Sequence, residues 1–173
     1  MSHMKNFASF FVSIGLLIFS GAVVAENDPS SKYKVLSTEN SSFNENSINS
    51  LLNQAEVSIN NGNLDDAVEK LNKVRTISNL LINYYRDLHG SFTGIDALIP
   101  RELTKKNRNV VQLLAEANMQ LAIIYRSKGE PELSVPLLVE VVKNLTPANP
   151  RGAQAYQQLV ELGLVETTYK GAP

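Results

Sequence analysis

Apolar residues recur every three or four positions through most of the chain after residue 47, and this spacing predicts amphipathic helices. The first helix is expected to begin near Ser47 or Ile48 and to end at the polar sequence 60–63. There, Gly62 is suited to the left-handed conformation that ends a helix, and Asn63 to the cap of the next one. The first apolar stripe consists of Ile48, Leu51, Leu52, Ala55 and Ile59.

The pattern predicts longer helices in the middle of the chain and a short one near its end. The second helix continues for about 25 residues to His89–Gly90, longer than an average helix. The third begins near Pro100 and leads to a tight turn at 128–130, from which a fourth returns to Pro147. The sequence 153–163 is a short amphipathic segment stopped by Gly163, as expected of a helix that covers the last open face of a helical stack. The stripe of the second helix consists of Ala67, Leu71, Val74, Leu81, Tyr85 and Leu88.

An internal repeat links the two turns. Four residues after and including the first turn glycine reappear 67 positions later in the same order: Gly62, Ala67, Leu71 and Val74 return as Gly129, Ser134, Leu138 and Val141. The offset is close to twice the roughly 34 residues of one tetratricopeptide unit. No complete extra unit fits between the turns, so lengthened inner helices are expected to use the intervening residues.

The sequence 115–147 resembles a tetratricopeptide unit. Leu121-Ala122 followed by Tyr125 fits the family's conserved run, and Ser134 and Leu138 occupy its small and aromatic positions. Small residues at 122 and 134 let two helix backbones approach each other. The resemblance covers about 48–147, with Asn118 in the family's tryptophan position. It implies an all-α fold of two antiparallel helix hairpins with elongated inner helices, plus a C-terminal capping helix.

This resemblance also implies where a partner binds, since family members hold a peptide or helix in a concave groove lined by the first helix of each pair. Arg126 is the expected anchor, because a guanidinium holds a carboxylate through two parallel hydrogen bonds. The alternative is that Arg126 is an exposed cation that only satisfies the helix dipole. Met119 is expected to be the flexible apolar centre. The predicted groove residues are Asn49, Glu56, Asn60, Gln112, Glu116, Met119, Ile123 and Arg126.

The connection at 89–100 contains four large apolar residues, Phe92, Ile95, Leu98 and Ile99, which is unusual for a solvent-exposed loop. We expect these side chains to fold back over the open edge of the hairpin. The alternative is a partner-binding loop. His89 is expected to serve a helix end rather than catalysis.

The N-terminal residues 1–25 have the layout of a secretory signal peptide, with Lys5 before an uncharged apolar run and small residues before a cut after Ala25. An uncleaved anchor helix is the alternative. The polar residues 26–47 are expected to form a flexible tether before a helical domain at 48–173. Together with PELSVPLLVEVV, the leader also resembles small exported repeat proteins of photosynthetic bacteria. Export is therefore expected, to the periplasm or thylakoid lumen, or otherwise to the extracellular space.

The composition favours an interaction protein over an enzyme. The net charge is −1, cysteine is absent and two histidines occur, so no nucleic-acid binding, metal or cofactor is expected. No phosphate loop or nucleophile motif is present. Arg101, Lys105 and Arg108 share one face, which is expected to be solvated, and a membrane is expected as partner only through an uncleaved leader. Two functions remain: an adaptor or assembly factor that binds a protein or peptide, or a self-associating structural domain of the cell envelope.

Overall fold

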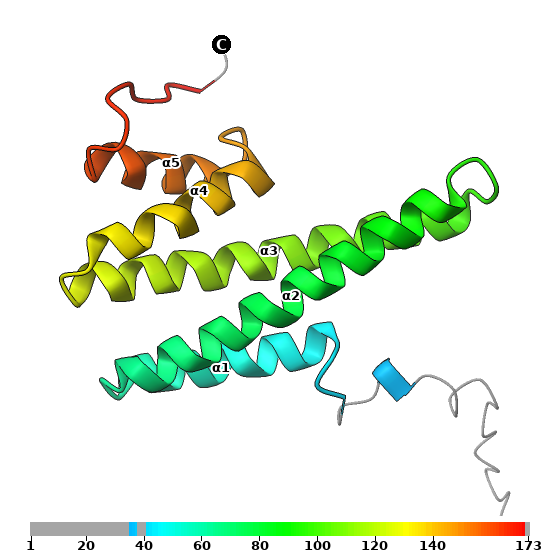
Figure 1. Cartoon of the computed structure of the whole chain (residues 1–173), viewed down its shortest axis with the longest axis horizontal. Coiled ribbons are helices and arrows are strands. Elements are labelled where there is room, and N and C mark those ends of the chain that lie inside the picture. The colour runs from blue at the N-terminus through cyan, green and yellow to red at the C-terminus, as the bar shows by residue number, and fades with distance from the viewer. Residues whose placement is uncertain (1–34, 38–40, 172–173) are drawn as a thin grey trace, which may run out of the picture. The chain divides into compact units, whose positions relative to one another are not determined.

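The structure is a computed structural model that describes residues 35–37 and 41–171. The signal peptide and its expected cleavage site after Ala25 lie outside these residues. The described part is all-helical, without strands, and neighbouring helices along the chain pack antiparallel (Figure 1). Its α-helices are α1 (Glu45–Asn60), α2 (Leu64–Phe92), α3 (Leu98–Ser127), α4 (Ser134–Leu145) and α5 (Pro150–Glu161), with short 3-10 helices η2 (Val35–Ser37) and η3 (Pro131–Leu133).

Helix α1 begins slightly earlier than expected because Asn44 caps it. The Asn44 side chain accepts a hydrogen bond from the Ser47 amide at 2.8 Å, and the Ser47 hydroxyl accepts one from the Asn44 amide at 3.3 Å. This reciprocal pair satisfies two amides that the first helical turn leaves free. Just before it, the Phe43 ring packs on Tyr84 of α2, with ring centroids 5.9 Å apart. The ordered domain therefore includes the last residues of the sequence that we expected to be a tether.

Both predicted turn glycines adopt the left-handed conformation, with φ of 75° at Gly62 and 77° at Gly129. In the first turn the Asn63 amide donates to the Ser58 carbonyl at 2.8 Å, and in the second the Glu130 amide donates to the Tyr125 carbonyl at 2.9 Å. These bonds satisfy carbonyls at the ends of α1 and α3. The prediction of two equivalent turns, 67 residues apart, is confirmed.

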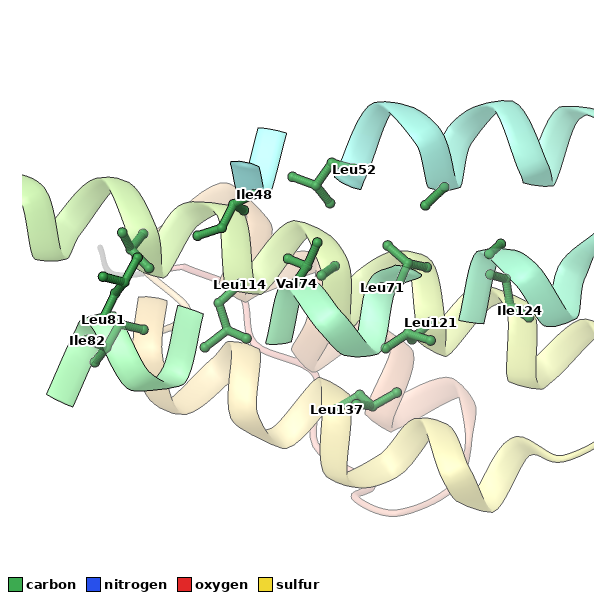
Figure 2. Close-up of a cluster of buried hydrophobic side chains, with 14 residues drawn as sticks. Ile48, Leu52, Leu71, Val74, Leu81, Ile82, Leu114, Leu121, Ile124 and Leu137 are labelled. Atoms are coloured by element: carbon green, nitrogen blue, oxygen red, sulfur yellow. The ribbon is translucent and has the colours of Figure 1, made fainter. Parts of the chain in front are cut away.

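The repeated apolar positions are buried in both halves. Ala67, Leu71 and Val74 are fully buried on α2, and so are their counterparts Ser134, Leu138 and Val141 on α4. The larger core cluster joins α1, α2 and α3, with Leu137 contributed by α4, and is centred on the extensive contact between α2 and α3 (Figure 2). Burial of these side chains is the main force that holds the helices together.

The close contact predicted between α3 and α4 is present. Ala122 is fully buried, and the Ser134 hydroxyl donates to its carbonyl oxygen at 3.2 Å. Tyr125 is only half-buried, although it packs against the larger core cluster.

The predicted C-terminal helix is α5, which packs on α4. Its Ala155 and Leu159 join Ala115, Met119 and Ala122 of α3 in a second core cluster. The entry to α5 is tight, because a Cβ atom on Gly152 would lie 2.0 Å from the Thr146 carbonyl oxygen. Glycine at 152 thus allows the first turn of α5 to pass close to the end of α4.

The expectation that the apolar residues of 89–100 fold back over the hairpin is wrong. Ile95 is 79% exposed and Leu98 is 74% exposed. Helix α2 continues to Phe92 and α3 already begins at Leu98, so only residues 93–97 connect them. Such a short connection cannot return along two long helices.

Candidate functional site

The predicted groove residues of α1 lie on its open surface. Asn49, Glu56 and Asn60 are all exposed. The Asn49 side chain donates to the Glu45 carbonyl oxygen of its own helix at 2.9 Å. These side chains are thus available to solvent along α1.

The predicted residues of α3 meet α5, which contributes polar partners along its length. Arg151 donates to the Gln112 carbonyl oxygen at 3.0 Å and pairs with the Glu116 carboxylate at 3.8 Å. At the other end of the same face, Arg126 donates to Gln158 Oε1 at 3.3 Å and pairs with Glu161 at 3.5 Å. Four side chains or backbone groups that sequence reasoning assigned to an open groove of α3 therefore face or contact α5.

Met119 lies in the middle of this face and is only 7% exposed. Ala155 and Leu159 of α5 belong to the same buried cluster. The expectation of an open, flexible apolar centre at Met119 does not match this position. A partner would reach the thioether only if α5 moved away, so Met119 belongs to the core.

The open part of the face is a hollow of about 290 Å³ between α3 and α5. Ile123 is 57% exposed at its α3 side, and Arg126 lies one turn further on. Its remaining lining residues, all from α5, are Gln154, Gln157, Gln158 and Glu161. We call these six residues the α3–α5 hollow.

The bonds of Arg126 bear on its two expected roles. Arg126 lies in the last turn of α3, as an end-of-helix cation would. Its guanidinium nevertheless points to α5, where Gln158 and Glu161 fix it at the wall of the hollow. A guanidinium held by two partners keeps further N–H donors for a ligand.

The α5 residues of the hollow were not predicted, although the sequence contains a signal for them. Gly163 follows Gly129 by 34 residues and has a φ of 76°. The Leu164 amide donates to the Leu159 carbonyl at 3.0 Å, the same bond that Glu130 makes to Tyr125. In this register Gln157 corresponds to Ile123, and therefore to Glu56 of α1.

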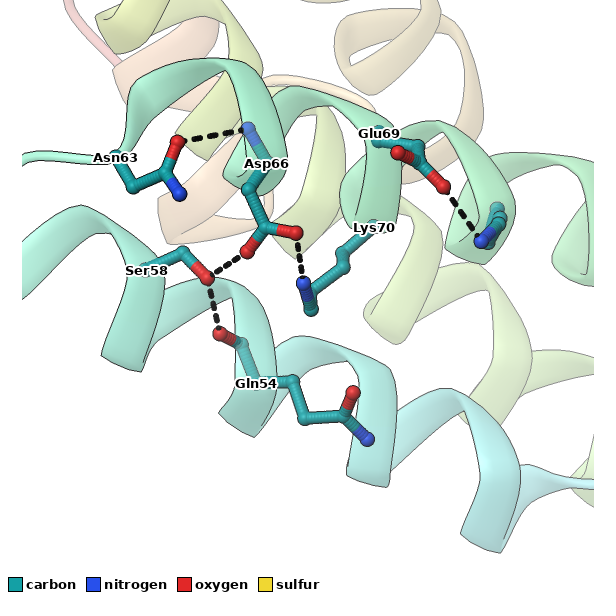
Figure 3. A network of polar contacts seen from close by, with 7 residues as sticks. Gln54, Ser58, Asn63, Asp66, Glu69 and Lys70 are labelled. Carbon is teal, nitrogen blue, oxygen red and sulfur yellow. Dashed lines mark hydrogen bonds and ion pairs between the residues drawn. The ribbon is translucent and has the colours of Figure 1, made fainter.

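A separate polar network ties α1 to α2 (Figure 3). The Asp66 carboxylate accepts hydrogen bonds from the Ser58 hydroxyl and the Lys70 ammonium. The Lys70 bond is the larger cause of the lowered pKa of Asp66, and the Ser58 bond adds to it. Ser58 also donates to the Gln54 carbonyl oxygen at 2.9 Å. All of these partners are in the chain itself, so the network explains helix packing rather than chemistry on a ligand.

Asn118, in the position where the family resemblance expects tryptophan, is fully buried. Its amide donates to the Glu140 carboxylate of α4 at 2.9 Å, and Arg75 of α2 pairs with the same carboxylate at 3.3 Å. A polar contact thus takes the place of aromatic packing where α2, α3 and α4 meet.

Among the described residues, no group of three or more histidine, cysteine, aspartate or glutamate side chains is arranged to hold a metal ion. None of the helices in 35–37 and 41–171 has the length and apolar character needed to cross a membrane. In the comparisons with known proteins, no family model, curated protein or solved structure matches this chain.

Proposed function

We propose that this chain is an exported, non-enzymatic helical-repeat adaptor or assembly factor of the tetratricopeptide type, and that it binds an extended peptide of a protein partner. The observation that carries this proposal is the α3–α5 hollow, in which exposed Ile123 and oriented Arg126 face glutamine side chains of α5. The binding surface extends from the hollow to the open residues of α1.

Three equivalent turns support the repeat assignment. Gly62, Gly129 and Gly163 all have positive φ, and each is followed by a residue whose amide bonds to the carbonyl five positions earlier. The spacings of 67 and 34 residues correspond to about two repeat lengths and one. In this interpretation α5 is the first helix of a further unit and not only a cover.

The chemistry of the hollow suits a peptide. Glutamine amides carry both donors and acceptors and can pair with the backbone of an extended chain. Ile123 offers apolar area at the centre, where anchors contribute most to binding. Arg126 is placed to accept a carboxylate, either from an acidic side chain or from a chain terminus. We therefore propose an acidic peptide with one apolar side chain as the ligand class.

The export part of the proposal rests on the sequence 1–25 alone. Mass spectrometry of the protein from its native host tests it, since cleavage after Ala25 leaves Glu26 at the N-terminus. An intact leader in a membrane fraction would contradict it.

Self-association as a structural domain is the second candidate, favoured by the exposed apolar residues Ile95 and Leu98. A concentration series by light scattering separates the two functions. A monomer across the series supports the adaptor, and a mass that rises with concentration supports self-association.

The adaptor function is tested by affinity capture from the native host with the mature chain and with Ile123→Asp. Position 123 is exposed, so the carboxylate should leave the fold intact while it repels an acidic, apolar ligand. Glu132→Ala, at an exposed position outside the hollow, is the matched control. A partner retained by wild type and control but lost with Ile123→Asp supports the proposal, and equal retention by all three contradicts it.

A further inference from the structure

The end of the α2–α3 hairpin exposes a group of large apolar side chains. Leu88 is 48% exposed and Ile99 is 37% exposed, in addition to the more open Ile95 and Leu98, and Phe92 is half-buried beside them. We call these five residues the apex. Figure 1 shows that α2 and α3 extend together past the ends of α1 and α4, with the apex at their far end.

Hydrogen bonds hold the apex in a defined shape. The Asp96 carboxylate accepts bonds from the Leu98 and Ile99 amides, both at 2.7 Å. On the α2 side, the Thr93 hydroxyl donates to the His89 carbonyl oxygen at 2.8 Å, and the Ile95 amide donates to the Phe92 carbonyl at 3.1 Å. The apolar side chains are therefore presented on a closed turn in which both helix ends are satisfied.

Cations surround the apex. The sequence 83–108 contains five lysine and arginine residues against three acidic ones, a net charge of +2 in a chain whose net charge is −1. Within the described residues, Arg86, Arg101, Lys105 and Arg108 form no ion pair. All four are exposed.

The acidic residues of this region are only partly neutralised. Asp96 bonds to backbone amides, and Glu102 pairs with Lys106 at 3.2 Å. Asp87 is exposed and leaves the local charge less positive than the cations alone would make it. The excess of unpaired positive charge nevertheless lies within the first turns behind the apex.

We propose that this hairpin end docks on an anionic membrane surface, with the apex in the acyl-chain boundary and the cations at the lipid phosphates. Arg101 follows Leu98 by three residues, a helical rise of about 4.5 Å, and Lys105 follows it by about 10 Å. These rises match the roughly 5–10 Å to which apolar residues of interfacial helices enter a bilayer. Long cationic side chains can reach the phosphates from such positions.

The form of the apex favours a membrane over a protein partner. An apolar end that projects on two helices can enter a flat bilayer without a matching pocket. The charge around it is complementary to anionic lipid and is attracted over about 10 Å at moderate salt. Each cation near such a surface contributes about fivefold to partitioning.

The test uses the absence of tryptophan from the chain, which makes one introduced indole a specific probe. Ile95→Trp reports on the apex, and Val57→Trp, at a 59% exposed position on α1, is the matched control. Full-length protein is mixed with vesicles of phosphatidylcholine containing 30% phosphatidylglycerol, and with vesicles of phosphatidylcholine alone. Because residues 7–24 are apolar and can bring the chain to vesicles by themselves, the readout is quenching by brominated acyl chains rather than sedimentation.

We expect the anionic vesicles to shift the Ile95→Trp emission to the blue and brominated chains to quench it, with neither effect at Val57→Trp. Adding Arg101→Glu and Lys105→Glu should weaken partitioning tenfold or more, whereas Lys143→Glu on α4 should not. An apex tryptophan that stays unquenched on bound vesicles overturns the proposal. So does a blue shift without vesicles together with a doubled mass in light scattering, which would assign the apex to a second copy, or apex-dependent capture of a protein without any vesicle binding.

Discussion

The Ser134 hydroxyl donates a hydrogen bond to the Ala122 carbonyl oxygen at 3.2 Å, and both residues are fully buried. This bond joins α3 to α4 at a point where neither residue has a side chain large enough to separate the backbones. Ala55 and Ala67 are likewise fully buried on α1 and α2, 67 residues earlier. Close helix approach through small residues is thus a property of both hairpins.

Enlarging Ala122 tests this contact. Ala122→Leu should overpack the α3–α4 contact and lower the free energy of unfolding by about 1–3 kcal/mol, measured by urea denaturation. The neighbouring Ile123→Leu, at an exposed position, should change stability little. An unchanged melting temperature for Ala122→Leu would count against the close approach.

A second packing prediction concerns Gly152. Gly152→Ala places a methyl group against the Thr146 carbonyl oxygen, so α5 must shift, at a cost of about 1–3 kcal/mol in unfolding free energy. Gly90→Ala is the matched control, because nothing lies within 4 Å of its new Cβ. Alanine within helix α2 should stabilise by about 0.5–1 kcal/mol. If both variants change stability equally, the tight entry to α5 is incorrect.

The Asp66 network predicts a pH dependence. Bonds from Lys70 and Ser58 lower the pKa of Asp66 in the folded state, so the unfolded chain takes up a proton at higher pH than the folded one. The stability this carboxylate contributes is therefore complete above about pH 4, the ordinary aspartate range, and is lost as the pH falls through the lowered folded pKa. Wild type should exceed Asp66→Asn in stability at pH 7, and the difference should shrink by pH 3.

Urea unfolding of both proteins at several pH values measures this difference. Lys70→Gln removes the larger cause of the shift and should reduce the pH-dependent part of the gap. A gap that is the same at pH 7 and pH 3 would show that Asp66 titrates alike in both states.

Met119 gives a prediction that separates core from groove. With Ala155 and Leu159 packed in the same cluster, Met119→Ala should leave a cavity and cost about 2–5 kcal/mol in unfolding free energy. Thermal denaturation followed by circular dichroism measures the loss. A variant with wild-type stability and reduced partner affinity would return Met119 to the binding surface.

Features set by short stretches of sequence were predictable. Gly62 and Gly129 take the left-handed conformation, and Asn63 caps α2, because these preferences depend on the residue and its immediate neighbours. The equivalent burial of Leu71 and Leu138 followed from one repeated pattern.

The errors arose where position depends on distant parts of the chain. Met119 was assigned to an open face because the sequence spacing does not reveal that α5 lies over it. The apex was expected to be covered because the connection looked long. Its ends proved to be helical, which left Ile95 and Leu98 with no neighbouring element to pack on.

The most direct test of the groove is the equilibrium affinity of the captured partner's peptide for wild type, Ile123→Asp, Arg126→Ala and Leu98→Ser, measured by titration calorimetry. Binding in the α3–α5 hollow predicts that Ile123→Asp and Arg126→Ala each weaken the affinity about tenfold or more, as central anchors do, with helicity retained. Leu98→Ser, at the apex, should bind as wild type does. Normal binding by both hollow variants together with loss of binding in Leu98→Ser would contradict the proposed function and place the peptide site at the end of the hairpin.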